Sequence, residues 1–280
     1  MLLKDALALA VERLTTVHIG SPRMNAELLL RFALSCDRAY LYAHPERDLT
    51  SDEQARYDEV IAQRSRGIPA QYITGHQEFW GMDLIVSPAV LIPRPETEHL
   101  IESVLPLARS IEHPRIVDVG TGSGCIALAL AHELPSAEIH ATDISAAALE
   151  VARANAARHQ FDQRIHFHHA DLLQGFPEQN FDLVVSNPPY VGSSEEDEVQ
   201  LEVRKCEPRD AVFAGPTGLE VISRLVPQAQ AVLRAGGWLA IEISGSIVSG
   251  IKAMLSPWED LQIVPDLQGI PRVVLARKPD

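Results

Sequence analysis

The chain has 280 residues, of which 46% are hydrophobic and 22% charged, and its 24 basic and 38 acidic residues give a net charge of −14. This composition excludes intrinsic disorder and collagen-like architecture, because the apolar residues suffice for a sizeable core. The acidic composition argues against binding of nucleic acid through its phosphates, since proteins that bind in this way usually present a basic face. No run of about 18 uninterrupted apolar residues occurs, so we expect no membrane span.

The cysteines and the start of the chain indicate a cytoplasmic protein. Cys36, Cys125 and Cys206 lie far apart without a Cys-x-x-Cys spacing, which excludes a cysteine-based zinc cluster and argues against a disulfide framework. The first residues have the pattern of a charged amphipathic helix and not of a signal peptide. The histidine-rich residues 166–169 have no carboxylate or cysteine at ligand spacing, so we expect no metal.

Residues 1 to about 72 carry helical periodicity almost throughout and predict a small bundle of three or four helices. Apolar residues recur at helical spacing in two successive segments: Ala6, Leu7, Ala10, Val11 and Leu14, then Ala26, Leu29, Leu30, Ala33 and Leu34. Ser21-Pro22 is a start signal for the second helix. A third helix is predicted from Thr50 towards Arg64.

The pattern changes at Gly67, because residues 68–75 are rich in turn formers and residues 78–87 alternate enough to predict a β-hairpin. We therefore expect a helical domain at residues 1–75, a hairpin linker at 76–90 and a larger domain at 91–280. The acidity belongs mainly to the larger domain. Residues 1–85 hold 9 basic and 12 acidic groups, whereas residues 86–280 hold 15 and 26.

From Arg115 onward, predicted strands and helices alternate. They are strand 115–119, helix 125–133, strand 137–142, helix 146–159, strands 164–170 and 181–186, helix 218–233, strand 237–243 and closing strands 261–264 and 272–276. This alternation predicts an α/β fold with a mainly parallel sheet covered by helices on both faces. Ligands of such sheets bind at the carboxyl ends of the strands, so the loops after the first four strands form the predicted site.

The first of these loops is rich in glycine. It comprises Gly120, Thr121, Gly122, Ser123 and Gly124. Cys125 stands where a dinucleotide fingerprint would have its third glycine, and the Lys-Ser/Thr pair of a phosphate-binding loop is missing. A glycine loop without these phosphate signatures fits a nucleoside ligand that lacks pyrophosphate, such as S-adenosylmethionine. The alternative is an ordinary tight turn.

Two acidic residues follow the next strands. Asp143 ends the second strand, where a carboxylate can accept hydrogen bonds from both ribose hydroxyls, and Asp171 follows the third, beside the expected adenine position. A single aspartate at a strand end is often only a helix cap. Three such loops in register favour a ligand site.

The most specific motif is Asn187-Pro188-Pro189-Tyr190, directly after the fourth strand. Two consecutive prolines remove two backbone donors and stiffen the turn, which leaves carbonyl oxygens beside the Asn187 side-chain oxygen as free acceptors. Such acceptors can hold the two hydrogens of a planar NH2 group, and Tyr190 offers a flat face for stacking. Catalysis would then rest on positioning and electrostatics. The alternative is a rigid turn that merely ends a strand.

With these motifs the chain resembles class I S-adenosylmethionine-dependent methyltransferases that act on an amide or exocyclic amino nitrogen. Further segments narrow the resemblance: 71–75 running into 78–81, Leu91-Ile-Pro-Arg-Pro-Glu-Thr-Glu98, Glu207-Pro-Arg209 and 214–219. They are similar to the peptide chain release factor glutamine N5-methyltransferases over nearly the whole chain. The resemblance implies a Rossmann-like sheet of strand order 3-2-1-4-5-7-6 with strand seven antiparallel. It also implies a small all-helical N-terminal domain that docks the release factor, and a β-hairpin linker.

The resemblance also implies roles for individual residues. Residues Gly120 to Gly124 would wrap the methionine portion of S-adenosylmethionine, Asp143 would bind its ribose, and Asp171 with Leu172 would lie against its adenine. Asn187, Pro188, Pro189 and Tyr190 would hold the side-chain amide of the substrate glutamine, with Asn187, Pro188 and Tyr190 as the catalytic group and Asn187 also beside the cofactor. Many relatives carry an aromatic residue at Leu172, so adenine stacking would be weaker here.

Two other functions compete with methylation of a release-factor glutamine. A DNA or RNA methyltransferase acting on adenine N6 or guanine N2 would present the same planar NH2 group from a flipped base, but would need a basic surface. A cofactor-binding adaptor would keep the fold without catalysis, and the intact Asn187 and Tyr190 argue against it. The acidic run 195–198 after the tetrad is expected to be a solvated loop.

Overall fold

The computed structural model describes residues 1–177 and 179–280, and the chain forms two compact units. The first unit comprises Met1–His76 and Leu201–Cys206, and the second comprises Gln77–Gln200 and Glu207–Asp280. The short segment Leu201–Cys206 lies within the range 91–280 and nevertheless clusters with the helical unit. Among the described residues no helix combines the length and the apolarity that crossing a bilayer requires.

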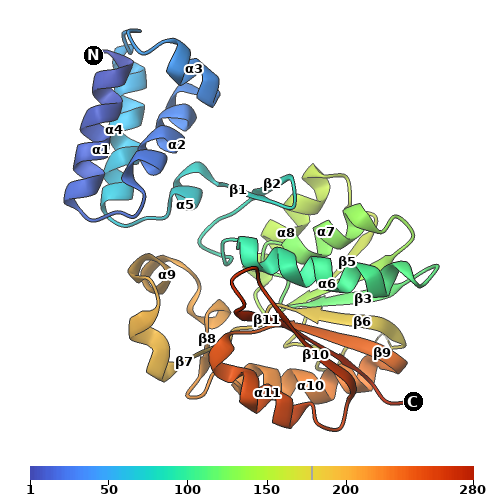
Figure 1. Ribbon diagram of the computed structural model, residues 1–280. Coiled ribbons are helices and arrows are strands. Elements are labelled where there is room, and N and C mark those ends of the chain that lie inside the picture. Colours follow the sequence, from blue (N-terminus) through green and yellow to red (C-terminus); the bar gives the residue numbers. More distant parts are fainter. Residues whose placement is uncertain (178) are drawn as a thin grey trace. The chain divides into compact units, whose positions relative to one another are not determined.

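The first unit is built of helices, with an isolated β-bridge between Leu2 and Asp48 (Figure 1). Its helices are α1 (Leu3–Thr16), α2 (Pro22–Leu34), α3 (Arg38–Ala43), α4 (Ser51–Ser65), α5 (Ala70–Thr74) and α9 (Leu201–Cys206). The predicted helical periodicity is confirmed, because Ala6, Ala10 and Leu14 of α1 are buried against the apolar face of α2. Thr50 caps α4 through its hydroxyl, which accepts from the Glu53 N–H at 3.2 Å, and the Glu53 carboxylate accepts in return from the Thr50 N–H at 2.9 Å.

Two features of this unit were not expected from the sequence. Residues 68–75, whose composition is that of a turn, contain the single-turn helix α5, because Pro69 can precede a helix and Gly75 can end one with a φ of +77°. In addition, the buried guanidinium of Arg64 binds the Asn25 side-chain oxygen at 2.7 Å and forms an ion pair with Glu202 of α9. This ion pair joins α9 to α4 within the helical unit.

A β-hairpin follows, as predicted, with strands β1 (His76–Phe79) and β2 (Met82–Ile85). Its two-residue turn has Trp80 and Gly81 both at positive φ, the conformation of a tight hairpin turn. Phe79, Met82 and Leu84 are buried in the core cluster of the second unit. The hairpin therefore packs its apolar face against the same core as the large sheet.

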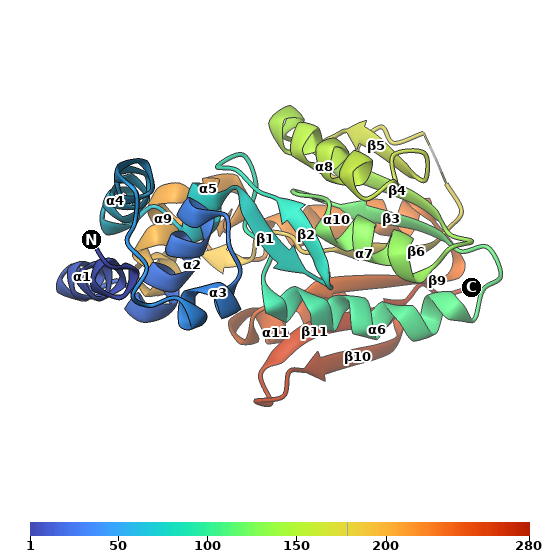
Figure 2. The same ribbon diagram turned by 90° about the horizontal axis from the view of Figure 1, so that it is seen from above.

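The second unit is built on a seven-stranded sheet. Its strands are β3 (Arg115–Val119), β4 (Glu138–Asp143), β5 (Ile165–His169), β6 (Phe181–Ser186), β9 (Leu233–Glu242), β10 (Glu259–Pro265) and β11 (Pro271–Arg277). They pair in the order β10-β11-β9-β6-β3-β4-β5, with β11 antiparallel to both neighbours and the pairs from β9 to β5 parallel. Counted along the chain this is 3-2-1-4-5-7-6, so the expected topology is confirmed. Figure 2 shows β5 and β10 at opposite edges of the sheet.

Helices cover both faces of the sheet (Figure 1). One face packs against α6 (Glu98–Arg109), α7 (Cys125–Glu133) and α8 (Ala146–Arg158), and the other against α10 (Glu220–Val232) and α11 (Val248–Met254). All six residues of the central strand β6 are buried, as a strand covered on both faces requires. Helices α6 and α11 were not expected from the sequence. Pro106 inside α6 is a local signal against a helix, but the strongly apolar face of this segment is buried against the sheet.

The remaining elements are short. Strands β7 (Val191–Gly192) and β8 (Phe213–Gly215) pair with each other beyond the tetrad. The acidic residues 195–198 were expected to be a solvated loop; they lie in a 3-10 helix spanning Ser193–Glu198, and none of its residues is buried, so only the expected loop conformation is wrong. The Arg209 guanidinium donates two hydrogen bonds to the Glu196 carboxylate, at 2.7 and 2.8 Å.

Gly124 shows how closely α7 and α8 approach each other. It immediately precedes α7 with a φ of +85°, and a Cβ atom at this position would lie 2.6 Å from Leu128 Cδ1 and 3.2 Å from Ala152 Cβ. Gly269 has a similar φ of +80° in the turn before β11, but nothing lies within 4 Å of its Cβ position. A side chain at either glycine would strain the backbone, but only a side chain at Gly124 would also overlap with neighbouring atoms.

We predict that Gly124→Ala lowers the free energy of unfolding by about 1–3 kcal/mol more than Gly269→Ala, because only the former adds a core overlap to the strained φ. Urea unfolding of both variants and the wild type, followed by circular dichroism, measures the difference. Equal losses in the two variants would show that α7 and α8 adjust freely and that the overlap does not matter.

Candidate active site

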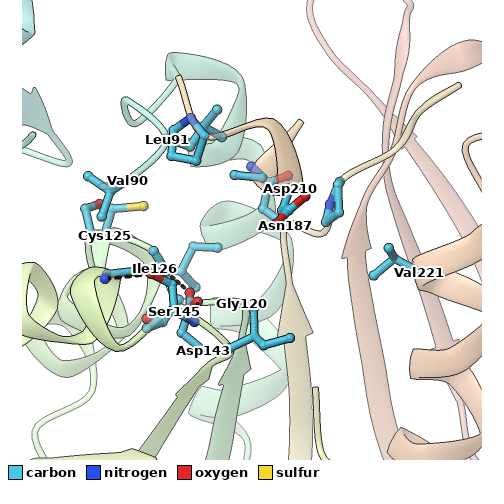
Figure 3. A pocket seen from close by; sticks show the side chains of 18 of the residues that line it. Val90, Leu91, Gly120, Cys125, Ile126, Asp143, Ser145, Asn187, Asp210 and Val221 are labelled. Carbon is cyan, nitrogen blue, oxygen red and sulfur yellow. Dashed lines mark hydrogen bonds between the residues drawn. The ribbon is translucent and has the colours of Figure 1, made fainter. Parts of the chain in front are cut away.

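A cavity of about 440 Å³ opens at the carboxyl edge of the sheet in the second unit (Figure 3). The predicted site residues that line it are Gly120, Thr121, Gly122, Ser123, Asp143, Asp171, Leu172, Asn187 and Pro189. Gly124, Pro188 and Tyr190 are not among the lining residues. The structure thus brings the loops after β3, β4, β5 and β6 to one cavity, whereas three predicted residues do not line it.

Hydrogen bonds to β4 hold the glycine loop in place. The N–H groups of Gly120 and Thr121 both donate to the Thr142 carbonyl, each at 2.9 Å. A Cβ atom at Gly120 or Gly122 would meet nothing within 4 Å, so the loop borders open space. Gly124, by contrast, faces the α7–α8 contact described above, and its lack of a side chain serves helix packing.

Asp118 secures the same loop from inside the protein. Its carboxylate accepts the Thr121 hydroxyl at 2.6 Å and the Ala127 N–H at 3.2 Å, both through Oδ2. The other oxygen, Oδ1, is buried without a hydrogen-bond partner among the described residues. Burial raises the pKa of Asp118 to about 7, and the two hydrogen bonds offset only part of that effect.

Asp143 joins two loops through its carboxylate. Oδ2 accepts the Gly122 N–H and Oδ1 accepts the Ser145 N–H, each at 2.8 Å. The N-cap of α8 is Ser145, whose hydroxyl accepts the Ala148 N–H at 3.1 Å, so Asp143 is not the helix cap. Burial raises the pKa of Asp143, while the backbone N–H donors lower it. Figure 3 shows Asp143 and Ser145 together at the cavity wall near Gly120.

Asp171 and Leu172 form the wall after β5. Asp171 makes an ion pair with Arg224 of α10, and both residues line the cavity. Leu172 has a φ of +55°, a conformation that L-residues adopt only when the surroundings impose it. Its neighbour Leu173 is tied down by its N–H, which donates to the Gln228 side chain at 2.8 Å. The strained backbone at Leu172 therefore lies at a wall of the cavity.

Two residues of the tetrad after β6, Asn187 and Pro189, line the cavity. The Asn187 Nδ2 donates to the Thr97 hydroxyl oxygen at 3.1 Å. Tyr190 is not among the lining residues, and its hydroxyl donates to Glu242 Oε1 at 3.2 Å. Burial raises the pKa of Tyr190, so the phenol stays protonated.

Glu242, at the end of β9, is a functional candidate that sequence reasoning missed. It is buried, and its Oε2 accepts no hydrogen bond from the described residues. Burial raises the pKa of Glu242 to about 6, while the Thr97 and Tyr190 hydroxyls lower it. The only sequence signal was its position at the carboxyl end of the fifth strand.

The segment 89–97 also lines the cavity, with Val90, Leu91, Pro93, Arg94 and Thr97. Arg94 forms an ion pair with the buried Glu207, and the other Glu207 oxygen accepts the Ile92 N–H at 3.2 Å. Two segments that supported the family resemblance, 91–98 and 207–209, are thus joined to each other at the site. The signal for these residues was their unusual density of prolines and charges.

No group of three or more histidine, cysteine, aspartate or glutamate side chains could hold a metal ion among residues 1–177 and 179–280. The histidines of β4 and β5 interact with one another instead. His140 Nδ1 lies 3.0 Å from His168 Nε2, and His140 Nε2 lies 2.8 Å from Glu138 Oε1. His169 Nε2 lies 2.8 Å from the Ile144 carbonyl oxygen.

The raised pKa of Asp118 predicts a pH dependence of stability. The folded state keeps this proton up to pH about 7, whereas the unfolded chain releases it near 3.8. The folded state therefore binds more protons between these values, so the contribution of Asp118 to stability falls as pH rises through that window. We expect the free energy of unfolding of Asp118→Asn, relative to that of the wild type, to rise by up to about 4 kcal/mol between pH 4 and pH 8.

Urea unfolding of the wild type and Asp118→Asn in parallel, at a series of pH values, measures this difference. Other titrating groups are common to both proteins and cancel. A difference that stays constant with pH would show that Asp118 is ionised in the folded state at all of these values.

Known proteins match this chain in sequence and in fold. The family description "PrmC N-terminal domain" matches residues 5–75, and "Methyltransferase small domain" matches residues 97–204. The catalytic domain of hMettl16, solved with the MAT2A 3′UTR hairpin 6, shares the fold with a TM-score of 0.57 at 17% identity, covering 79% of this chain and 83% of that one. A methyltransferase from Pyrococcus furiosus has a TM-score of 0.52 at 18% identity, covering 82% and 100%.

Curated relatives of high similarity extend over the full chain. The protein named release factor glutamine methyltransferase from Koribacter versatilis is 55% identical over 280 residues, which cover 100% of this chain and 99% of the relative. The protein of the same name from Moorella thermoacetica is 42% identical over 279 residues, covering 99% and 98%. With the fold, the cavity and these relatives in agreement, the chain belongs to the family of release factor glutamine methyltransferases.

Proposed function

We propose that this protein transfers a methyl group from S-adenosylmethionine to the side-chain amide nitrogen, N5, of a glutamine. The substrate is the glutamine of the Gly-Gly-Gln motif in bacterial-type peptide chain release factors. The observation that carries the proposal is the position of the Asn187 carboxamide. It lines the same cavity as the glycine loop and Asp143, in a chain whose relatives are release factor glutamine methyltransferases.

The cavity fits the cofactor that the family implies. Its volume of about 440 Å³ lies in the range of small-molecule sites, roughly 300–1,000 Å³. We assign Gly120, Thr121, Gly122 and Ser123 to the methionine portion, Asp143 to the ribose, and Asp171 with Leu172 to the adenine. When bound, the cofactor supplies an electrophilic methyl group on a positively charged sulfur. Gly124 supports this loop through the α7–α8 contact and not through the lining.

Asn187, Pro188 and Pro189 would hold the substrate amide. The Asn187 Nδ2 is occupied by Thr97, which leaves its Oδ1 as the acceptor for one hydrogen of the substrate NH2 group. A backbone carbonyl of the proline turn would accept the other hydrogen. Two acceptors on one NH2 group orient the nitrogen and make it more electron-rich, which is catalysis by positioning and electrostatics.

The proton that the amide nitrogen loses after methylation would leave to water. No histidine is among the residues that line the cavity, and the Tyr190 phenol has a raised pKa. A general base is therefore not part of the proposed mechanism. Tyr190 would also restrict the motion of the tetrad through its hydrogen bond to Glu242.

The two units suggest a division of labour. We propose that the helical residues 1–75 dock the release factor, that residues 76–90 link, and that residues 91–280 carry out catalysis. Residues 1–85 have a net charge of −3, against −11 for residues 86–280. A nearly neutral docking unit suits a protein substrate better than a polyanion.

We predict that Asn187→Ala lowers the rate of methyl transfer to a purified bacterial release factor by about 100- to 1,000-fold, as expected for loss of a preorganised acceptor in the site. Transfer of a radiolabelled methyl group to the release factor is the measurement. Asn180→Gly is a matched control, since it removes a carboxamide before β6, at the opposite end of the same strand, where a φ of +64° suits glycine.

The same assay distinguishes the substrates. Release factor, DNA and ribosomal RNA are incubated separately with the wild type and labelled cofactor. Label on nucleic acid alone would overturn the proposed substrate, whereas full transfer by Asn187→Ala would overturn only the mechanism.

We also predict that Asp143→Ala weakens S-adenosylmethionine binding by at least about tenfold, because it removes the ribose acceptor and frees the Gly122 N–H. Isothermal titration calorimetry measures the affinity. Asp162→Ala, which removes an exposed carboxylate outside the cavity lining, serves as the control and should bind as the wild type does. Equal affinities for all three proteins would remove Asp143 from the proposed binding site.

A further inference from the structure

We infer that Thr97 and Glu242 are positioning residues that fix which end of the Asn187 carboxamide faces the substrate. The inference deepens the proposed function, because its consequence for methyl transfer depends on the glutamine amide being the substrate. Its structural part, the orientation of the Asn187 side chain, does not depend on any substrate.

A carboxamide has two ends of nearly equal shape, one that accepts and one that donates. Only the oxygen end can accept a hydrogen of a substrate NH2 group. If the side chain turned over, its NH2 group would face the substrate NH2 group, and two donors would meet. The orientation of Asn187 therefore decides whether the amide is held or repelled.

Thr97 supplies the contact that distinguishes the two ends. Its hydroxyl oxygen accepts the Asn187 Nδ2 at 3.1 Å, and its side chain is only 1% exposed, so water does not compete. A hydroxyl can donate as well as accept, however. Thr97 alone would tolerate a reversed Asn187, with the hydroxyl donating to Oδ1.

Glu242 removes this ambiguity. Glu242 as a whole residue is 2% exposed, and the Tyr190 hydroxyl donates to its Oε1 at 3.2 Å. Its Oε2 is buried without a hydrogen-bond donor among the described residues, and we place the Thr97 hydrogen on this oxygen. When ionised, a carboxylate can only accept, so only a lone pair of the Thr97 hydroxyl then remains for Asn187. The Thr97 hydroxyl accordingly lowers the pKa of Glu242, against the larger effect of burial. With this bond Thr97 would link Asn187 to Glu242, which already accepts from Tyr190, so one buried carboxylate would order two members of the tetrad.

The charge state of Glu242 depends on groups from several elements. Glu96, which precedes Thr97 in the chain, raises its pKa, and Arg272 of β11 lowers it, while Arg272 is itself paired with Asp266 at 2.8 Å. Cys125 of α7 also senses the Glu242 charge, and burial raises the pKa of that thiol. Protonation of Glu242 would let it donate to Thr97 and would remove the preference for one Asn187 orientation.

The first experiment observes Asn187 directly and needs no substrate. The sequence contains only Asn25, Asn155, Asn180 and Asn187, so selective ¹⁵N-asparagine labelling yields few side-chain NH2 signals. Asn187→Ala identifies the signal of interest. Thr97→Val keeps the shape but removes the hydroxyl, and Thr97→Ser keeps the hydroxyl.

We expect slow hydrogen exchange and a shifted proton for the Asn187 NH2 group in the wild type and Thr97→Ser, and loss of both in Thr97→Val. In the wild type the signal should change with pH around a midpoint of about 6. In Glu242→Gln this pH dependence should vanish. Asn187 signals that are identical in the wild type and Thr97→Val, or a pH response that persists in Glu242→Gln, would overturn the inference.

The second experiment measures methyl transfer to the release factor. Thr97→Val should lower kcat at least tenfold, with the dissociation constant for S-adenosylmethionine within twofold of the wild type. Thr97→Ser should restore at least a third of the wild-type kcat. A Thr97→Val protein that is folded and retains its wild-type kcat would contradict the inference. If the wild type itself transfers no methyl group to the release factor, the proposed function fails, while the labelling experiment still decides the role of Thr97 and Glu242.

Discussion

The candidate site depends on the parallel pairing of β3 with β4 on one side and with β6 on the other. Parallel strands end at a common edge, so this pairing brings together loops that are far apart in the sequence. Val119, the last residue of β3, is in register with both Thr142 and Ser186. The Ser186 hydroxyl also donates to the Val119 carbonyl at 2.7 Å. The glycine loop, Asp143 and Asn187 therefore all follow strand residues that are in register with one another at the carboxyl edge of the sheet.

Three buried carboxylates then order the loops at that edge. Asp118 holds the glycine loop, Glu207 holds the segment that begins at Ile92, and Glu242 holds Tyr190. Burying a carboxylate is costly unless it is paired or protonated. Glu207 is paired with Arg94, whereas the pKa values of Asp118 and Glu242 rise to about 7 and 6. The fold gives up stability at these positions and gains a fixed geometry at the cavity.

Much of the fold could be predicted because it rests on local patterns. Strands 115–119 and 181–186 and helix 125–133 appear with the predicted bounds. The helices α6 and α11 were missed, since their burial against the sheet overrides weak or contrary local signals. Of the predicted tetrad, Tyr190 was expected to offer its ring to the substrate, and this stays a prediction; the structure adds a hydrogen bond from its hydroxyl to Glu242 that no local pattern indicated. This hydrogen bond gives Tyr190 a proposed supporting role in the tetrad as well.

The sequence by itself determined the α/β architecture, the order of its elements and the family resemblance, because periodicity and short motifs are encoded in neighbouring residues. The net charge of −14 likewise came from composition alone. Only the tertiary structure decided which residues meet. Thr97 and Asn187 are 90 positions apart, Arg94 and Glu207 are 113 apart, and Tyr190 and Glu242 are 52 apart. Such contacts arise from strand register and from the burial of polar groups in a dry core, and no local pattern specifies either.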